Sequence, residues 1–243
     1  MTGVALSIEN VLERFPDYRV ALVVARDLVI PDHPPPQISD YVTAAERAIV
    51  DDWGDRPVSE MTEVAAWRQA YKGFGIRKTS YRPSVERLVR HIQRHGALPR
   101  VNALVDFYNA VSVAFRMPAG ADDLDKIEPP LAFRFSKDSD SFIALGDKAA
   151  QNDPPKPSEV VYADQRHVLC RRWNWYQDYR TATSAASRNA VITVQSIAGA
   201  GEHAVEDAAA VLAQGLERDF SARVVWAVAD RSVPIVVADS QPR

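Results

Sequence analysis

The chain has 243 residues, of which 47% are hydrophobic and 25% are charged, a balance typical of a globular protein with one sizeable core. Its single cysteine, Cys170, excludes an intrachain disulfide, and no apolar run reaches the roughly 20 residues of a membrane-spanning helix. The net charge is −3, and charges interrupt the N-terminal stretch where a signal peptide would need an apolar centre. We therefore expect a soluble protein of the reducing cytoplasm.

The first sixty or so residues predict one strand and two helices. Val20 to Ile30 is a continuous run rich in β-branched residues, which is typical of a strand buried on both faces. A proline-rich break at 31–37 precedes a helix predicted over 38–52. A second helix is predicted over 59–71, opened by a Ser or Thr cap.

The next stretch is strongly basic. From Trp67 to Arg100 there are nine Lys or Arg residues and one acid, Glu86, so this window carries +8 and the rest of the chain about −11. Within it a helix is predicted from Ser84, ended by Gly96 as a C-terminal cap. Its apolar and basic residues separate onto opposite faces, the basic face consisting of Arg87, Arg90, His91 and Arg94. A face of one sign favours contact with a polyanion, although a solvated surface helix is the alternative.

The following predicted helix, 102–115, is apolar except for one narrow stripe. On a helical wheel Asn102, Asp106 and Asn109 fall on the same side, and the stripe contains neither lysine nor glutamate. Two amides and one carboxylate could form a buried hydrogen-bond network. Alternatively they line a wet pocket that holds a polar ligand, because an amide offers both a donor and an acceptor.

The second half of the chain predicts mostly strands. A loop over 117–127 is followed by predicted strands at 131–135, 141–146 and 159–163, and the last of these begins a β-hairpin that continues into Cys170 and the aromatic residues after it. A strand at 190–197, a helix at 202–220 and a strand at 223–229 complete the pattern. Because several strands are consecutive, the sequence predicts an α+β fold with a mixed or antiparallel sheet.

Familiar catalytic and cofactor motifs are missing. The sequence contains no phosphate-binding G-x-x-x-x-G-K-[ST], no dinucleotide G-x-G-x-x-G and no G-x-S-x-G elbow. His91 and His95 have a spacing that can hold zinc, but a third ligand of obvious kind is lacking, so we predict no metal and no cofactor. Cys170 alternates with apolar neighbours, which is more typical of a buried thiol than of a nucleophile.

The stretch CRRWNWYQDYR, 170–180, interleaves arginines with tryptophans and tyrosines. This composition is typical of surfaces that stack and neutralise single-stranded nucleic acid. A strand end whose tryptophans belong to the core is the competing interpretation.

Three segments, GALPRVNALVDFYNAVS, MPAGADDLDKI and PPKPSEVVYADQRHVLCRRWNWYQ, in this order, resemble the free-standing B3/B4-type domain proteins. Those proteins are similar to the editing module of the phenylalanyl-tRNA synthetase beta subunit, and the resemblance covers 65–229. It implies an α+β fold with a β-sandwich-like core and flanking helices. It also implies that the chain binds tRNA and hydrolyses mischarged aminoacyl-tRNA in trans, without the parts needed for aminoacylation.

The stripe and the resemblance together give a set of candidate residues. The candidate catalytic residues are Asn102, Asp106 and Asn109. The motif positions implied for substrate binding are Ser112, Asp123, Tyr162, Asp164, Arg172, Trp173 and Asn174, with Asp125 beside them. The candidate RNA-binding residues are Arg77, Lys78, Arg82, Arg87, Arg90, Arg94 and Arg171. We expect residues 1–60 to form an extension packed on a tRNA-binding domain at 61–235.

Three functions remain open at this point. An aminoacyl-tRNA end presents an ammonium, an ester carbonyl, ribose hydroxyls and phosphates, which the polar stripe and the basic window can contact. Because the ester is already activated, positioning a water and the ribose hydroxyl could suffice for hydrolysis. The alternatives are a non-catalytic RNA-binding module and a small-molecule enzyme that reuses the amino-acid pocket.

Overall fold

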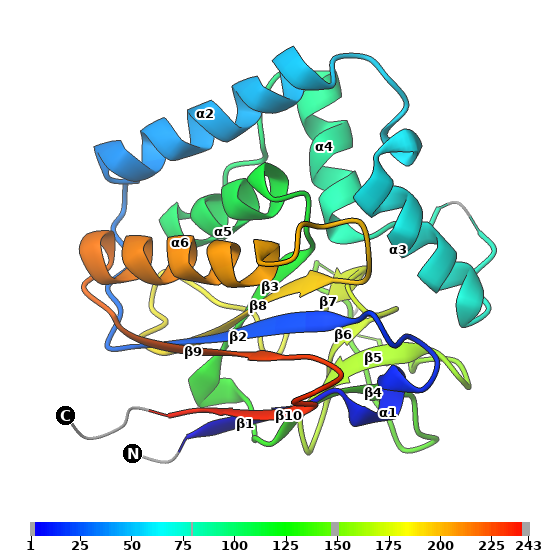
Figure 1. Ribbon diagram of the computed structural model, residues 1–243. Helices are drawn as coiled ribbons and strands as arrows, with labels where there is room; N and C mark the ends of the chain where they lie inside the picture. Colours follow the sequence, from blue (N-terminus) through cyan, green and yellow to red (C-terminus); the bar gives the residue numbers. More distant parts are fainter. Residues whose placement is uncertain (1–2, 79, 147–150, 240–243) are drawn as a thin grey trace.

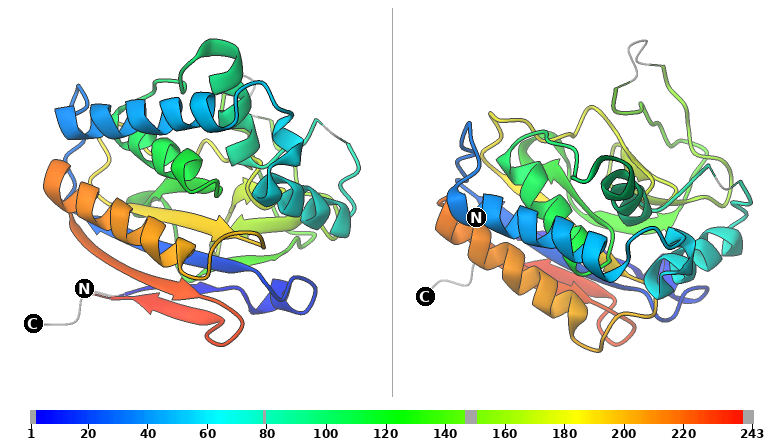
Figure 2. Two further views of the ribbon diagram at one scale, coloured as in Figure 1. Left: turned by 45° about the horizontal axis from the view of Figure 1, so that its top comes forward. Right: turned by 90° about the horizontal axis from the view of Figure 1, so that it is seen from above.

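The structure, a computed structural model, describes residues 3–78, 80–146 and 151–239 and has three layers. A layer of helices lies on one face of a four-stranded sheet, and a six-stranded sheet lies on its other face (Figures 1 and 2). The described strands pair antiparallel except for β1 and β4, which run parallel. The predicted α+β fold with a mixed, sandwich-like core and flanking helices is confirmed.

The two sheets take their strands from distant parts of the chain. The four-stranded sheet has the order β3 (Ala119–Asp123), β8 (Ala190–Ser196), β2 (Arg19–Arg26) and β9 (Arg223–Ala229). The six-stranded sheet has the order β10 (Ile235–Ala238), β1 (Val4–Ser7), β4 (Leu131–Phe135), β5 (Val160–Ala163), β6 (Val168–Arg171) and β7 (Tyr176–Gln177).

The position of β2 in the fold explains why its sequence is apolar throughout. It lies between β8 and β9, and its side chains alternate between two separate cores. Ala21, Val23 and Ala25 face the helices, whereas Val20, Leu22 and Val24 face the six-stranded sheet. Since both faces are buried, no position on the strand favours a polar residue. The strand predicted from this run is confirmed, although it ends at Arg26 rather than at Ile30.

The helical layer consists mainly of α2, α4, α5 and α6. The helices are α1 (Glu9–Leu12), α2 (Pro36–Asp52), α3 (Thr62–Gly73), α4 (Ser84–His95), α5 (Ala103–Ala114) and α6 (Ala204–Asp219), with short 3₁₀ turns at Val58–Glu60 and Leu124–Lys126. Gly96 caps α4 with a left-handed φ of 74°, as the sequence predicts. Among the described residues, no helix is long and apolar enough to cross a membrane.

The strand predicted over 141–146 is wrong. Within it only Ala144 makes an isolated β-bridge, to Asp178. The backbone N–H groups of Phe142 and Ile143 donate instead to side chains, those of Asn152 and Asp178, at 2.9 and 2.8 Å. Side-chain oxygens thus satisfy two backbone donors that a regular strand would pair with a neighbouring strand.

Two further sequence-based expectations need correction. The segment predicted as a loop contains β3, whose small residues pair with β8 in the four-stranded sheet. Here tertiary pairing outweighs the low strand propensity of alanine, glycine and aspartate. The helix predicted over 59–71 is a 3₁₀ turn followed by α3, and its N-cap is Met61 without a side-chain cap. Strands β1, β7 and β10 were not expected from the sequence.

Candidate functional site

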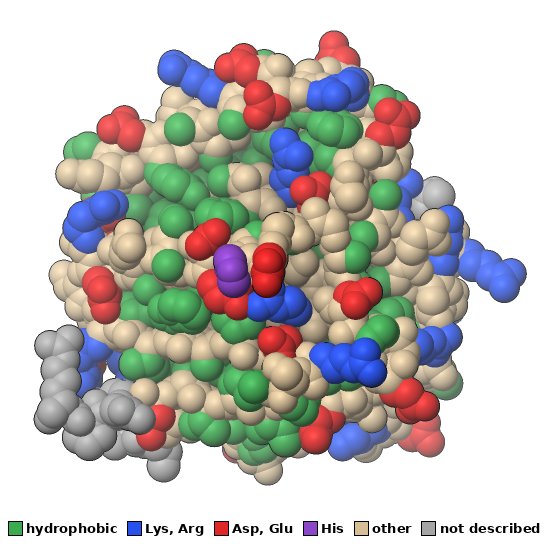
Figure 3. Space-filling view, in the orientation of Figure 1, with side chains coloured by type: hydrophobic (Ala, Val, Ile, Leu, Met, Phe, Trp, Pro, Cys, Tyr) green, Lys and Arg blue, Asp and Glu red, His purple; other side chains and the backbone are tan. Residues whose placement is uncertain are grey.

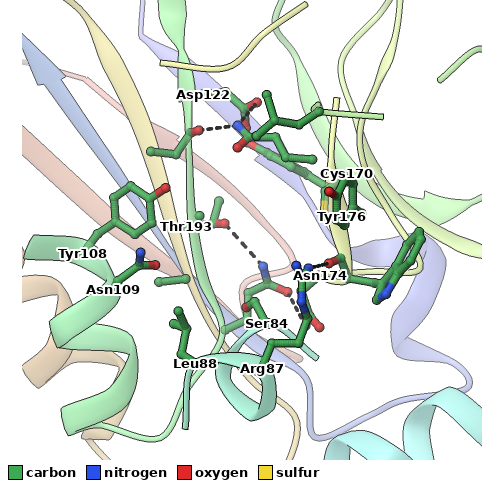
Figure 4. Close-up of a pocket in the computed structure, with 18 of the residues that line it drawn as sticks. Ser84, Arg87, Leu88, Tyr108, Asn109, Asp122, Cys170, Asn174, Tyr176 and Thr193 are labelled. Atoms are coloured by element: carbon green, nitrogen blue, oxygen red, sulfur yellow. Dashed lines mark hydrogen bonds between the residues drawn. The ribbon is translucent and has the colours of Figure 1, made fainter. Parts of the chain in front are cut away.

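A cavity of about 400 Å³ lies between α4, α5 and the strands of both sheets (Figure 4). Three tyrosines and one tryptophan belong to its wall, together with a larger number of polar side chains. The lining side chains that enter the discussion below are Ser84, Arg87, Tyr108, Asn109, Asp122, Tyr162, Cys170, Asn174, Tyr176, Gln177, Thr193 and Gln195.

Asp122 provides the acidic end of this cavity. It is the fourth residue of β3 and is 4% exposed. Burial raises the pKa of its carboxyl to about 7, although hydrogen bonds from Thr181 and Gln177 oppose the shift. Thr181 Oγ1 and Gln177 Nε2 donate at 2.6 and 3.0 Å, and both bonds end on Oδ1. Oδ2 is therefore available to a water or ligand, and the carboxyl can take up and release a proton near neutral pH.

The opposite end of the cavity carries donors. In Figure 4, Asp122 lies at the top, and Ser84 and Arg87 lie at the bottom with Asn174 nearer to them. Arg87 Nη1 donates to the backbone oxygen of Trp175 at 2.8 Å. Its guanidinium also lies over the ring of Tyr176, 5.1 Å from the centroid. The cavity thus has a carboxyl at one end and a cation at the other.

Two hydroxyls of the cavity wall are buried without a partner. Neither Tyr162 Oη nor Ser84 Oγ makes a hydrogen bond in the described residues. Most buried polar groups are paired, since an unmade hydrogen bond costs about 1–3 kcal/mol. Both side chains line the cavity, so a bound ligand or an ordered water is the natural partner.

The three residues of the predicted polar stripe do not line one cavity. Asn109 alone lines it. Asn102 is the N-cap of α5, and its side-chain oxygen accepts from the N–H of Val105 at 3.0 Å. Asp106 is 3% exposed and accepts from the N–H of Val101 at 2.8 Å. The expectation that all three point into one pocket is therefore wrong, because two of them satisfy the backbone at the start of the helix.

Asn102→Ala separates the capping role from the catalytic role predicted for this residue. Losing the cap should lower the free energy of unfolding by about 1 kcal/mol and leave ligand binding and hydrolysis unchanged. Denaturant unfolding and any activity assay check this, with Asn102→Ser, which can cap, as the control. Lost activity with unchanged stability would restore the catalytic assignment.

Most of the other implied substrate-binding residues stabilise turns or the core. Only Tyr162 and Asn174 of this set line the cavity. Asp164 accepts from three backbone N–H groups around the β5–β6 turn, and Trp173 is fully buried among aromatic rings. The remaining members have these contacts: Ser112 Oγ donates to Met117 O at 2.6 Å, Asp123 accepts from Ser187 Oγ at 2.6 Å, Asp125 accepts from Asn189 Nδ2, and Arg172 lies over the rings of Tyr81 and Trp175.

One arginine of the basic face of α4, Arg90, belongs to a cluster of ion pairs around an acid. Glu86 is fully buried and forms ion pairs with Arg68, Arg82 and Arg90 at 2.5, 3.1 and 2.9 Å. Arg77, Lys78, Arg87 and Arg94 are exposed. None of these four makes an ion pair among the described residues. Fewer basic side chains are therefore free to contact an anion than the sequence suggests.

The prediction that Arg171 contacts RNA conflicts with its position. The residue is 1% exposed, and its guanidinium pairs with Glu159 at 2.9 Å and with Asp153. Trp173 is also buried, whereas Trp175 and Tyr176 are partly buried and Tyr179 is exposed, so the stretch 170–180 fits the competing interpretation of a strand end in the core only in part.

Several side chains that line the cavity were not predicted from the sequence. Asp122, Thr193 and Gln195 lie on β3 and β8, and Ser84 begins α4. The polar residues of β8 are the one signal that could have been noticed, because Thr193 and Gln195 alternate with apolar residues on a buried strand. In the described part of the chain, no three His, Cys, Asp or Glu side chains are grouped to hold a metal ion.

One of the comparisons with known proteins, that with sequence models of families, identifies the kind of domain. No curated protein matches the chain. Among solved structures, an N-terminal fragment of the phenylalanyl-tRNA synthetase beta-subunit from Pyrococcus horikoshii is similar over 90% of this chain and 50% of that one, with 13% identity and a TM-score of 0.47. This chain thus spans about half the length of that fragment. The sequence model of the B3/4 domain matches residues 66–230, more than half of the chain. The chain belongs to the B3/4 domain family.

Proposed function

We propose that this protein binds the aminoacylated end of a tRNA and hydrolyses the ester in trans. The observation that carries the proposal is the polarity of the cavity, with Asp122 at one end and Ser84 and Arg87 at the other (Figure 4). An aminoacyl ester needs such a pair of ends, because it has an ammonium and water to be held on one side and a carbonyl and phosphates on the other.

Asp122 is the residue best suited to activate water. Its carboxylate accepts a proton from a water molecule as the water oxygen attacks the ester carbonyl carbon. When the tetrahedral intermediate collapses, the ester C–O bond breaks and the ribose oxygen leaves with that proton. The products are the free amino acid and a tRNA with an intact terminal ribose. A pKa of about 7 suits both transfers, since the group is near half-ionised at neutral pH.

The acyl group has room and apolar contacts in the same cavity. A volume of about 400 Å³ accepts an amino acid with part of its ribose, and the rings of Tyr108, Tyr162 and Tyr176 line the wall. The unpartnered hydroxyl of Tyr162 would gain a polar atom of the substrate. Asn109 adds a side-chain amide at the cavity wall.

The exposed cations supply contacts for the phosphates. Ser84 and Arg87 at the cavity belong to α4, and Arg77 and Lys78 lie in the loop that leads into that helix. Lys and Arg side chains stand out along the right edge in Figure 3, on the α3 side of the molecule. A single-stranded acceptor end that enters the cavity would pass cations of this kind.

A panel of tRNAs, each carrying a different mischarged amino acid, tests the proposal. We expect purified protein to release at least one amino acid faster than the spontaneous rate. Hydrolysis of none of them, at rates equal to the no-enzyme control, would reject it. Binding of tRNA without hydrolysis would instead favour the non-catalytic RNA module, and no affinity at low salt would favour the small-molecule enzyme.

Salt dependence tests the basic surface. Replacing Arg77, Lys78 and Arg94 together with glutamine should weaken tRNA binding and reduce the slope of log K against log salt by about 2 to 3, because each phosphate contact contributes about 0.7–0.9. The matched control replaces Arg166, Arg218 and Arg231, which are exposed but lie outside the basic window. An equal loss of affinity in both triple variants would indicate attraction by overall charge only.

A further inference from the structure

Behind the cavity lies a network of four buried side chains that the mechanism above does not use. Tyr71 Oη donates to Asn174 Oδ1 at 2.9 Å, and Tyr18 Oη donates to Gln195 Oε1 at 3.3 Å. Asn174 Nδ2 in turn donates to Gln195 Oε1 at 3.2 Å. All four residues are at most 5% exposed. The two amides line the cavity and the two tyrosines do not, so the phenols hold the amides from behind.

The phenol groups act only as donors to these amides. Burial raises the pKa of Tyr18 and of Tyr71 well above the usual range, so both keep their protons at any working pH. Each buried O–H proton needs an acceptor, and the amide oxygens of Gln195 and Asn174 are those acceptors.

This requirement fixes the orientation of both amides. Oε1 of Gln195 accepts two bonds, from Tyr18 and from Asn174, and Oδ1 of Asn174 accepts one from Tyr71. Turning both amides over would keep the bond between them but leave both phenol protons without an acceptor, at about 1–3 kcal/mol each. The nitrogens are therefore held away from the tyrosines.

The nitrogens then have N–H groups to spare. An amide nitrogen carries two N–H bonds. Asn174 uses one for Gln195, and Gln195 uses one for Thr193 Oγ1, a long contact of 3.4 Å. One N–H of each amide remains, and the two amides are in direct contact at the wall of the cavity. Preorganised neutral donors of this kind stabilise an oxygen that gains negative charge during a reaction.

We infer that Asn174 and Gln195 donate hydrogen bonds to the carbonyl oxygen of the bound ester as it becomes an oxyanion, and that Tyr18 and Tyr71 are positioning residues that keep the amides in the donating orientation. This inference rests on the proposed function, and it assigns two roles in the cavity. Asp122 accepts and returns the proton. The amides of Gln195 on β8 and Asn174 in the β6–β7 turn stabilise the negative charge on the substrate oxygen.

The test uses steady-state kinetics on the aminoacyl-tRNA that the panel identifies. Gln195→Glu replaces the spare N–H with an acceptor but keeps an oxygen for Tyr18, and we expect its kcat to fall about 100-fold with KM changed less than 2-fold. Tyr18→Phe and Tyr71→Phe remove the hydroxyl that holds each amide in its orientation, but they keep both amides as donors to the substrate. Each should therefore lower kcat about 3- to 10-fold, again with KM unchanged.

The control and a readout without substrate complete the test. Tyr41→Phe removes a hydroxyl in α2, away from the cavity, and should leave kcat and KM as they are. In ¹⁵N-labelled protein, the side-chain NH₂ signals of Asn174 and Gln195 should keep their positions in Tyr41→Phe and move or broaden in Tyr18→Phe and Tyr71→Phe.

The outcomes are distinguishable from failure of the proposed function. If wild type hydrolyses a tRNA ester and the Gln195 and tyrosine variants keep its kcat, the amide pair does not stabilise the transition state and this inference is overturned alone. A rise in KM at constant kcat also overturns it, because the contact would then be made equally to the ground state. If wild type hydrolyses no ester, the proposed function and this inference fall together.

Discussion

Asp122→Asn should lower the kcat of ester hydrolysis by about 10²–10⁴-fold, the usual contribution of a positioned general base. The exchange is nearly isosteric, and both hydrogen bonds to this side chain end on Oδ1, which the amide keeps. The variant should therefore fold and bind tRNA as wild type does. Deacylation rates and tRNA affinity, measured on the same preparations, check this.

The pH dependence provides a second check on the same residue. Because the base works only when ionised, the wild-type rate should rise with pH through about 7, the pKa to which burial raises Asp122. The residual activity of Asp122→Asn should lack this rising limb. Asp125→Asn, a change to an exposed carboxylate, is the control and should retain both rate and pH profile. An unchanged profile in Asp122→Asn would remove this residue from the mechanism.

The stability of Asp122→Asn should change in the opposite direction to its activity. The folded-state pKa of about 7 lies above the unfolded value, so the unfolded chain loses this proton first as pH rises. Between pH 4 and 7 the wild-type fold loses stability from this group, on the order of 3–4 kcal/mol in total. Asparagine avoids the loss, so thermal unfolding should show a gain in stability for the variant that is larger at pH 8 than at pH 5.

Glu86→Gln should destabilise the fold by about 3 kcal/mol. The carboxylate is fully buried and binds Arg68, Arg82 and Arg90, so its removal leaves three guanidinium groups beside one another. Breaking a buried ion pair in this way costs about 3–5 kcal/mol. We expect the lower end of the range, because the arginine side chains are 28–32% exposed and can turn toward water.

Acid titration tests Glu86 independently. Burial acts to raise its pKa, but the hydrogen bonds from Arg68 and Arg90 outweigh burial and the net shift is downward. Stability from this carboxylate is therefore present above its unfolded pKa and is lost as pH falls through its lower folded pKa. Glu128→Gln breaks an ion pair to Arg166 that is more than half exposed, and it should cost less than about 1 kcal/mol. Equal losses in the two variants would contradict a special role for Glu86.

The elements that sequence predicts well are those with a strong local signal. The run of β2 is apolar because both faces are buried, and α4 has cleanly separated faces and a glycine cap, so either can be recognised without knowledge of the neighbours. Strand β3 could not be recognised in this way. Its Ala, Gly and Asp residues disfavour strands, and tertiary pairing, mainly with β8, keeps them extended.

The site was harder to predict than the fold, for two physical reasons. Asparagine just before a helix is typical of an N-cap. Because Asn102 was counted as part of the helix face, a side chain that bonds to the backbone was predicted to line the pocket. The acidity of Asp122 depends on burial by strands from distant parts of the chain, which no local pattern encodes. Asn109, Tyr162 and Asn174 were predicted and do line the cavity, although their roles stay predictions.

The position of β2 also bears on how the protein can be shortened for study. The sequence that the B3/4 domain model matches begins at residue 66, but β2 ends at Arg26 and lies between β8 and β9. A fragment trimmed to 66–230 would remove β2, the only strand paired with β9 in the described part of the chain, and would expose apolar residues of both cores at once. Such a fragment should aggregate, and expression plasmids for crystallography or labelling need to retain the first thirty residues.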